Sequence, residues 1–544
     1  MPRPMPLPAN KSTWPPAKHA RRYRDAKLNL TWLGGDPSAL SAAYGGTYQG
    51  AQQVTSASTG GGAFSRAVAA IKAEFWGTQA TGELDSKRHS PVAEDIARTK
   101  AELMYAEEPR FTIDGPLYDA DGPNNADGNP EYLKGDPRPE TVAAQTRLDE
   151  LVDKSNLYAT LLAGAELGAA LGCYGLRVAV DQERMPDRPT IAGVDALHLI
   201  PEYSWGVLVA VTFWRVVHST DTELWRHLER HEGGKVFHGL YKGTRDNLGM
   251  AQPLTDLTEL ADLAVDADGA VTLSAARYLT GVSIPNALPD PLDLENNAGR
   301  SDFTPAVRDL FSAADEFYTR LMESVDDGRS RLIIADYLLN SAGKGQGLTF
   351  DRDERMMRRV SMPPAEDSSG KLPIEQIEFD LKVAEYLLGF EAMRENAIKA
   401  AGYNPQTMGD SGEVAMTATE YAGKNKRSMS TRGKSIRYAR PLLAQLLTAL
   451  VSVDVQEFKP KGADGSAIIA YPVRVEFPQA IQPTMTELVT NAKALKESGG
   501  SAEEVVRATY PGKSDAEVRV LATKRLEELT PVDPLSFGTA GAGL

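Results

Sequence analysis

Two long amphipathic segments constrain the fold of this 544-residue chain more than any other feature. Residues 304–325 carry apolar side chains at helical spacing, and these form one continuous stripe: Val307, Leu310, Phe311, Ala314, Phe317, Leu321 and Val325. Residues 379–401 repeat the pattern with Val383, Leu387, Phe390 and Met393. Helices of that length extend for roughly 30 Å, so each needs a partner along its apolar face. The sequence therefore predicts two long packed helices, with loops and short strands between them.

The rest of the chain mixes strands with helices. Residues 173–283 are mostly strand-like, and Gly233-Gly234 separates two alternating runs, which is typical of a β-hairpin. Helical periodicity occurs over 91–107 and 140–171, and a pair of strands is expected within 467–478. Three capping-box patterns precede apolar runs and predict a helical C-terminal region, at 484–487, 501–504 and 514–517. Together these patterns predict an α+β protein.

The two ends of the chain differ from its middle in composition. Residues 1–63 are rich in Pro, Gly, Ser and Thr and are predicted to be a flexible arm, with order beginning at a helix over 64–76. Residues 530–544 are small and are predicted to be disordered. No run of eighteen apolar residues occurs, so no membrane span is expected. The single cysteine, Cys173, is expected to be buried, and an isolated cysteine favours an intracellular setting.

No sequence motif predicts a catalytic residue, a metal site or a cofactor. The stretch HLERH places His227 and His231 in an H-x-E-x-H pattern, whereas zincins require H-E-x-x-H. In a strand, two residues four positions apart are separated by about 13 Å, too far to share one zinc ion. The phosphate-loop and nucleophile-elbow patterns are also absent from the sequence. A metal-dependent hydrolase using His227 and His231 stays as the less favoured alternative.

A loop-like stretch leads into the most basic part of the chain. The loop is predicted from turn-forming residues between two helical patterns: Asn404, Pro405, Gly409, Asp410 and Gly412. Residues 421–440 then contain seven cations and no acid, although the net charge of the whole chain is -15: Lys424, Lys426, Arg427, Arg432, Lys434, Arg437 and Arg440. These cations could pair with an acidic face of another subunit or domain, or they could contact nucleic-acid phosphates. Both interpretations stay open.

Five segments in order resemble the portal proteins of tailed bacteriophages, and most closely those of siphoviruses that infect actinobacteria. The segments are HSPVAEDIARTKAELMYAEEPRF (89–111), TFWRVV together with ELWRHLERHEGGKVFHGLYKGTRDNLG (212–249), FYTRLMESVDDGRSRLIIADYLL (317–339), AAGYNPQTMGDSGEVAMTATEYAGKNKRSM (400–429) and VEFPQAIQPTMTELVTNAKALKESGG (475–500). The resemblance covers residues 64–529.

The resemblance implies a portal-type subunit whose parts follow one another along the chain. After the arm come a wing (64–303), a first stem helix (304–325), a clip (326–378), a second stem helix (379–403), a tunnel loop (404–416), a long kinked spine helix (417–457), wing strands (458–483), a helical crown (484–529) and the tail. The tunnel loop would face DNA, and its glycines would let it move.

The function that the resemblance implies is structural. Portal subunits form a ring, usually of about twelve copies, at one capsid vertex. Double-stranded DNA enters and leaves through the channel of the ring. The expected partners are other copies of the chain, the DNA, the terminase, the head–tail connector, and the major capsid and scaffold proteins, with no membrane. The expected location is the virion, and the host cytoplasm during assembly. The alternative from a related class is a virion scaffold or adaptor that conducts no DNA.

Overall fold

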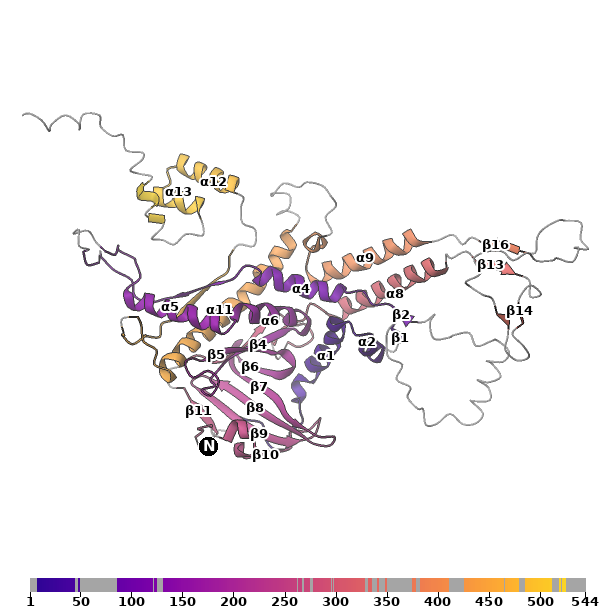
Figure 1. Ribbon diagram of the computed structural model, residues 1–544, viewed down its shortest axis with the longest axis horizontal. Helices are drawn as coiled ribbons and strands as arrows, with labels where there is room; N and C mark the ends of the chain where they lie inside the picture. The colour runs from indigo at the N-terminus through magenta and orange to yellow at the C-terminus, as the bar shows by residue number, and fades with distance from the viewer. Residues whose placement is uncertain are drawn as a thin grey trace, which may run out of the picture. The chain divides into compact units, whose positions relative to one another are not determined.

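The computed structural model (Figure 1) shows a mixed α+β protein. It describes residues 7–44, 47–48, 86–120, 122–124, 131–261, 263–266, 269–273, 277–294, 296, 298–327, 331–334, 340–341, 348–349, 374–377, 382–409, 425–463, 465–478, 485–510, 518–519 and 521–524. The chain divides into two compact units. Unit 1 comprises Met1–Leu30, Asp95–Thr304 and Ala401–Leu544, and unit 2 comprises Thr31–Glu94 and Pro305–Ala400.

An antiparallel sheet is the largest element of unit 1. Its path is β10–β9–β8–β7–β6, with β11 also paired to β9. The strands are β6 (Leu199–Ser204), β7 (Val207–Ser219), β8 (Leu224–Glu232), β9 (Lys235–Gly243), β10 (Met250–Gln252) and β11 (Ala270–Thr272). The hairpin predicted at Gly233-Gly234 is confirmed, because β8 and β9 pair antiparallel on either side of it. Gly234 has a φ of 77°, which a glycine adopts without strain.

The N-terminal segment is folded, so the prediction of a flexible arm over 1–63 is wrong for its described part. Residues 17–44 form η1 (Ala17–His19), α1 (Ala20–Gly34) and α2 (Pro37–Tyr44). Trp14 and Tyr23 are buried against the sheet in one cluster with Leu228 and Tyr241. The prediction was wrong because the composition of the segment suggested flexibility, whereas a few large aromatic side chains pack into the core and hold the segment in place. The helix predicted over 64–76 lies outside the described residues.

A second sheet and its helices complete the core of unit 1. It has the order β12–β4–β5, formed by β12 (Gly281–Pro285), β4 (Cys173–Ala179) and β5 (Thr190–Asp195). The helix expected over 140–171 is two helices, α5 (Pro139–Lys154) and α6 (Leu157–Leu171). Asn156 interrupts them with a left-handed φ of 49°, a conformation that Asn tolerates better than most residues. Cys173 is buried, as predicted.

The C-terminal part of the chain contributes a strand, a long helix and a small helical region. The strand pair expected within 467–478 is instead one strand, β17 (Val473–Glu476), which pairs with β3 (Arg110–Ile113). The helix predicted from residue 417 is described as α11 (Lys426–Glu457), and α4 (Val92–Tyr105) confirms the helix predicted over 91–107. Near the C-terminus, α12 (Met485–Glu497) precedes α13 (Ala502–Thr509), where Ser501 and Glu504 form the predicted capping box.

Unit 2 contains the two long helices on which the sequence analysis began. They are α8 (Pro305–Asp327) and α9 (Val383–Ala401), and they run side by side in Figure 1. Gly389 lies against the ring of Phe317, where any β-carbon would come within 2.6 Å of the ring, so only glycine permits this approach. Tyr318 and Phe390 are also in contact, with ring centroids 5.6 Å apart.

Short paired strands and buried contacts complete unit 2. Within the predicted clip, β13 (Arg331–Ile334) pairs with β16 (Ile374–Ile377), and β14 (Asn340–Ser341) pairs with β15 (Leu348–Thr349). The other pair is β1 (Thr47–Tyr48) with β2 (Ser86–Lys87). Most of the residues predicted as the clip lie outside the described ones. In the middle of α8, Asp315 accepts hydrogen bonds from the backbone N–H and the hydroxyl of Ser90. Across the described part of the chain, no helix is long and apolar enough to cross a membrane.

Candidate functional site

The predicted loop begins with one turn of 3-10 helix, η5 (Pro405–Met408). Asn404 precedes it, and its side-chain oxygen accepts a hydrogen bond from the backbone of Gln406 at 3.4 Å. Pro405 occupies the first position of the turn, where its missing N–H is not needed. Gly409 ends the turn with a φ of 89°, which favours glycine. Two further predicted loop residues, Asp410 and Gly412, lie outside the described residues.

Hydrogen bonds hold the two ends of the loop together. The Thr407 hydroxyl donates to Asn425 Oδ1 at 2.9 Å and lies 2.8 Å from the Ser428 hydroxyl. The backbone N–H of Asn404 donates to Ser428 Oγ at 2.9 Å. We call this set of contacts between 404–407 and 425–428 the clasp. The chain therefore leaves the clasp after Gly409 and returns to it at Asn425, and the residues between them lie outside the described ones.

A buried polar network lies beneath the clasp. Tyr403 is fully buried, and its hydroxyl donates to Asp302 Oδ2 at 2.7 Å. Burial raises the pKa of Tyr403 well above its usual value, and the Asp302 carboxylate raises it further. Asn286 donates to the other oxygen of Asp302 at 2.8 Å, so both carboxylate oxygens have a donor. The network fixes the chain just before the loop begins.

A lysine is buried in the same part of unit 1. Lys100, on α4, donates to the hydroxyl of Ser435 on α11 and is almost fully buried. Burial lowers the pKa of Lys100, while the charge of Asp302 opposes that shift. Thr431 donates to the carbonyl of Gly402 at 2.7 Å, which ties the first turns of α11 to the residue just before Tyr403. The sequence analysis did not predict this network, because its members come from four separate segments.

The first four turns of α11 carry the predicted cations, and five of them are exposed. They are Lys426, Arg427, Lys434, Arg437 and Arg440. We call the surface that they form the cationic face. Arg432 is different, because it is buried and donates to the carbonyls of Leu103 at 2.5 Å and Pro478 at 2.7 Å. Its expected role as a contact to DNA or to another subunit is therefore corrected to an internal structural role. Lys424 lies outside the described residues.

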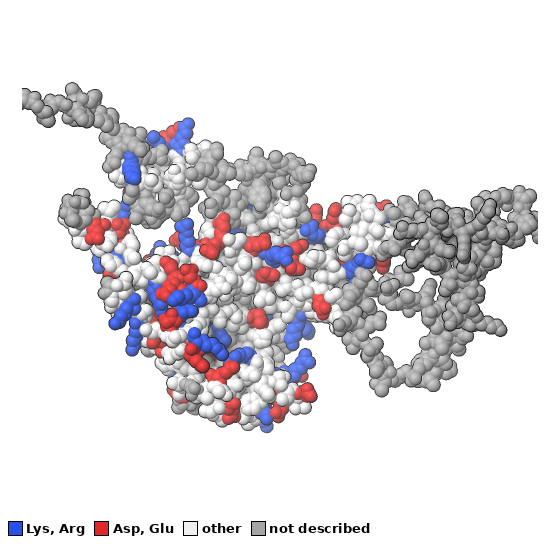
Figure 2. Space-filling model, in the orientation of Figure 1, with Lys and Arg blue, Asp and Glu red and all other residues white. Residues whose placement is uncertain are grey.

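The cationic face differs from the other helix surfaces of the protein. Elsewhere, helix cations pair with an acid three or four residues away, as in Lys154–Glu150, Arg320–Glu316, Lys399–Glu395 and Arg21–Asp25. On the face visible in Figure 2, acidic and basic side chains are likewise interspersed. No acid occurs in the sequence between residues 421 and 453, so α11 offers its own cations no such partner. Within the described ranges, Lys434, Arg437 and Arg440 have no ion pair.

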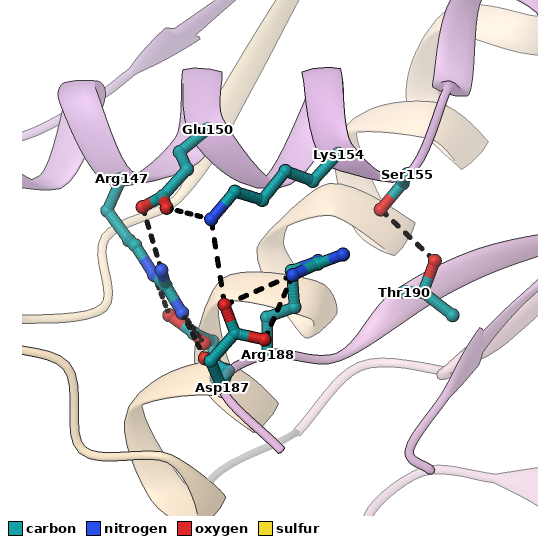
Figure 3. Close-up of polar contacts among 8 residues, drawn as sticks. Arg147, Glu150, Lys154, Ser155, Asp187, Arg188 and Thr190 are labelled. Carbon is teal, nitrogen blue, oxygen red and sulfur yellow. Dashed lines mark hydrogen bonds and ion pairs between the residues drawn. The ribbon is translucent and has the colours of Figure 1, made fainter. Parts of the chain in front are cut away.

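The other end of α11 is held by a bidentate ion pair. Asp454 is fully buried and accepts hydrogen bonds from Arg147 Nη2 at 2.7 Å and Nε at 2.9 Å. Arg147 also contacts Glu150 at 2.8 Å, which in turn contacts Lys154 at 2.5 Å (Figure 3). The hydrogen bonds to Asp454 raise the pKa of the Arg147 guanidinium above its usual value, so Arg147 stays charged. This anchor fixes α11 to α5 and leaves the basic end of the helix as the exposed one.

The histidines considered as a metal site lie in the large sheet. His227 Nε2 is 3.2 Å from His238 Nδ1 on the neighbouring strand. His231 instead lies between Thr280 and Glu229, each at 2.8 Å. The structure thus brings His227 to His238 rather than to His231. In the ranges given above, no three His, Cys, Asp or Glu side chains are grouped so that they could hold a metal ion.

The described site therefore consists of the clasp, a buried network beneath it and a cationic helix face beside it. Comparison with known proteins adds no family to this description. The sequence matches no protein-family model, and no curated protein is significantly similar to it.

Proposed function

We propose that the chain is a portal-type subunit, which assembles into a ring at a capsid vertex and conducts double-stranded DNA through the central channel. One observation carries this proposal: the clasp joins residues 404–407, where the predicted tunnel loop begins, to residues 425–428 at the basic start of α11, where no acid occurs between 421 and 453. A channel that conducts DNA needs an element that contacts the moving DNA while staying fixed to the protein. A loop tied at both ends to a buried network meets that need.

The charge of the chain suits a conduit better than a binding protein. A protein that neutralises many phosphates binds DNA tightly, and tight binding would hold the DNA in place. A net charge of -15 opposes such adhesion, while a few local cations can still make transient contacts. In this proposal the protein has no catalysis of its own. The terminase and the head–tail connector dock on the clip, and capsid and scaffold proteins surround the ring.

Substitution of the glycine at the loop boundary tests the proposal. Proline cannot adopt the φ of 89° at Gly409, and it removes the N–H that donates to the Gln406 carbonyl at 3.3 Å. Gly465 offers a matched control, because it has a φ of 78° and donates to the Gly462 carbonyl at 2.9 Å. No atom lies within 4 Å of the position of an added β-carbon at either glycine.

The measurement is nuclease-protected DNA per particle, in virus particles assembled with each variant in place of the wild-type chain. Gly409→Pro is expected to give normally assembled particles with several-fold less packaged DNA. Gly465→Pro carries equivalent backbone strain and is expected to package normally. Equal packaging by both variants would contradict the role of the loop, and an assembly defect in both would point to backbone strain alone.

A further inference from the structure

We propose that the N-terminal segment of each subunit docks on the large sheet of a neighbouring copy, so that exchanged segments link the subunits of the ring. We call residues 7–30 the docking segment, and we call the face of the large sheet that it contacts, together with residues 244–249, the acceptor surface. The same contacts form whether the two come from one chain or from two. This inference rests on the proposed ring, and it identifies a contact between neighbouring subunits.

The acceptor surface is shaped by contacts that do not involve the docking segment. Arg226, on β8, is buried and donates to the carbonyls of Arg245 at 3.0 Å and Asn247 at 3.3 Å, which holds the turn between β9 and β10. Gly249 closes that turn with a φ of 79°, and a β-carbon there would come within 1.9 Å of the Lys242 carbonyl oxygen. The acceptor surface is therefore built within unit 1 and can receive a docking segment from any copy.

The docking segment adds to this turn as an extra strand. Thr13 pairs antiparallel with Asn247. Three backbone hydrogen bonds join the two segments, from Lys11 N to Gly249 O at 2.6 Å, from Trp14 N to Asp246 O at 3.0 Å and from Leu248 N to Ser12 O at 2.9 Å. Strand addition through the main chain is a recurring way in which one chain binds another. The geometry of the contact is therefore one that a second chain can form.

The side chains that anchor the docking segment are of the types that dominate interfaces between chains. Trp14 and Tyr23 are buried in the cluster on the sheet, and Trp14 meets Trp214 edge-on with ring centroids 5.5 Å apart. Arg22 donates to the carbonyl of Leu199 at 2.5 Å. Trp, Tyr and Arg are the residues enriched among those that contribute most to binding between proteins. The docking segment thus carries anchors suited to binding a separate chain.

The docking segment also brings buried polar atoms that have no hydrogen-bond partner in the described structure. They are the Ser12 hydroxyl, Trp14 Nε1, both ring nitrogens of His19 and Arg22 Nε. The interior of a single folded chain leaves few such atoms. Interfaces between chains are more polar and include bridging water molecules. The contact is therefore closer in character to a subunit interface than to a domain core.

The path of the chain allows the exchange. The chain passes from unit 1 into unit 2 at Thr31 and returns to unit 1 at Asp95. Residues 49–85 of this stretch lie outside the described ones, and a chain of that length can span up to roughly 120 Å. Exchange keeps every contact between docking segment and acceptor surface, and in a ring it joins each subunit to the next.

Engineered disulfides in the full-length protein test which copy supplies the docking segment. Thr13→Cys with Asn247→Cys places cysteines on opposed residues of an antiparallel pair, where Cα atoms lie about 4.5–5.5 Å apart and a disulfide can form. The only native cysteine, Cys173, is buried. Ser219→Cys with Leu224→Cys is the control, because these residues are opposed on β7 and β8 of one hairpin and must pair within a chain.

The assembled protein is oxidised and its bands are compared on a denaturing gel without reductant, with maleimide labelling to count free thiols. Exchange predicts a ladder of disulfide-linked multimers for the Thr13 and Asn247 pair, and monomers alone for the control. Oxidised monomers would show that each docking segment binds its own chain, which would overturn the inference and leave the ring standing. Monomers with free thiols would show that the contact does not form and would also overturn it. A wild-type protein that forms no ring in electron micrographs would overturn both proposals.

Removal of the main anchor gives a second test. With exchange, Trp14→Ala should weaken assembly at least about tenfold, measured by sedimentation velocity as the protein concentration at which rings dissociate. Trp205→Ala is the matched control, because Trp205 is fully exposed at the turn between β6 and β7, and this variant should assemble normally. Normal assembly of a folded Trp14→Ala protein would contradict exchange.

Discussion

Strand β8 and the first turns of α11 are both dense in charge, yet they use it in opposite ways. On β8, Arg230 forms ion pairs with Glu202 at 2.5 Å and with Glu232 at 2.7 Å. Glu229 accepts from His231 at 2.8 Å and also contacts Arg177. On α11, the cations at 434, 437 and 440 are exposed, and no acid of the described chain pairs with them. The charges of β8 are part of the interior, and those of α11 remain available to a partner.

The difference follows from what burial demands of a charged group. A buried charge is stable only when hydrogen bonds and an opposite charge replace its hydration, so β8 must satisfy its charges within the subunit. An exposed charge is hydrated and needs no such partner. Charge density in a sequence therefore does not by itself indicate a binding surface, and the periodicity of burial decides which role a charged residue has.

The largest expected effect comes from breaking the network on β8. Glu229→Ala leaves Arg177 and His231 without their carboxylate partner in a largely buried place. We expect the free energy of unfolding to fall by about 3 kcal/mol, measured by urea denaturation. Glu223→Ala removes an exposed partner of Lys242 and should cost less than about 1 kcal/mol. Similar losses in the two variants would contradict the contrast between interior and surface charge.

Acidic pH should also destabilise the buried histidine pair on β8 and β9 before it affects the exposed cations of α11. Burial lowers the pKa of His227 to about 4, and burial also lowers the pKa of His238. In the unfolded chain His227 binds a proton below about pH 6.5, whereas in the folded protein it stays neutral down to about pH 4. Its contribution to stability is therefore full above pH 6.5 and falls as the pH drops towards 4. For His227 alone the loss approaches about 3 kcal/mol.

Thermal denaturation across this pH range measures the effect. His227→Gln should reduce the pH dependence, and the buried His19, whose pKa burial lowers to about 3, should account for part of what remains. His218→Gln, at an exposed position on β7, should leave the pH dependence unchanged. If the stability of the wild-type protein were constant from pH 6.5 to 4, burial of the histidine pair would not lower stability at acidic pH, which would contradict the prediction.

The smallest expected effect is on α11 itself. Lys434→Met together with Arg437→Met removes two exposed cations that have no ion pair in the described structure. The free energy of unfolding of the subunit should change by less than about 0.5 kcal/mol in a denaturation experiment under monomeric conditions. A loss of several kcal/mol would mean that these side chains belong to the interior, as Arg432 does.

Periodicity predicted much of the fold but little of what joins its parts. The long helices, the Gly233-Gly234 hairpin and the capping box at Ser501 follow from local patterns, and the structure confirms them. The burial of Arg432 also had a signal, because it lies on the helix face of Ile436, Ala439 and Leu443. The docking of Trp14 and the pairing of β17 with β3 join segments more than 200 residues apart. No local pattern encodes such contacts.

Within the candidate site, local sequence likewise predicted the turn but not the contacts that it makes. Turn-forming residues located Asn404, Pro405 and Gly409 correctly at a helix end and a turn. The hydrogen bonds that close the clasp depend on Thr407, Asn425 and Ser428, which are polar residues of ordinary helical and turn sequence. Only the three-dimensional arrangement shows that they meet.

Electron microscopy of the purified, negatively stained protein tests the central claim most directly. The account predicts class averages of a ring of about a dozen subunits, with a central opening wide enough for a DNA duplex. Monomers or dimers, or a closed assembly without a central opening, would contradict it.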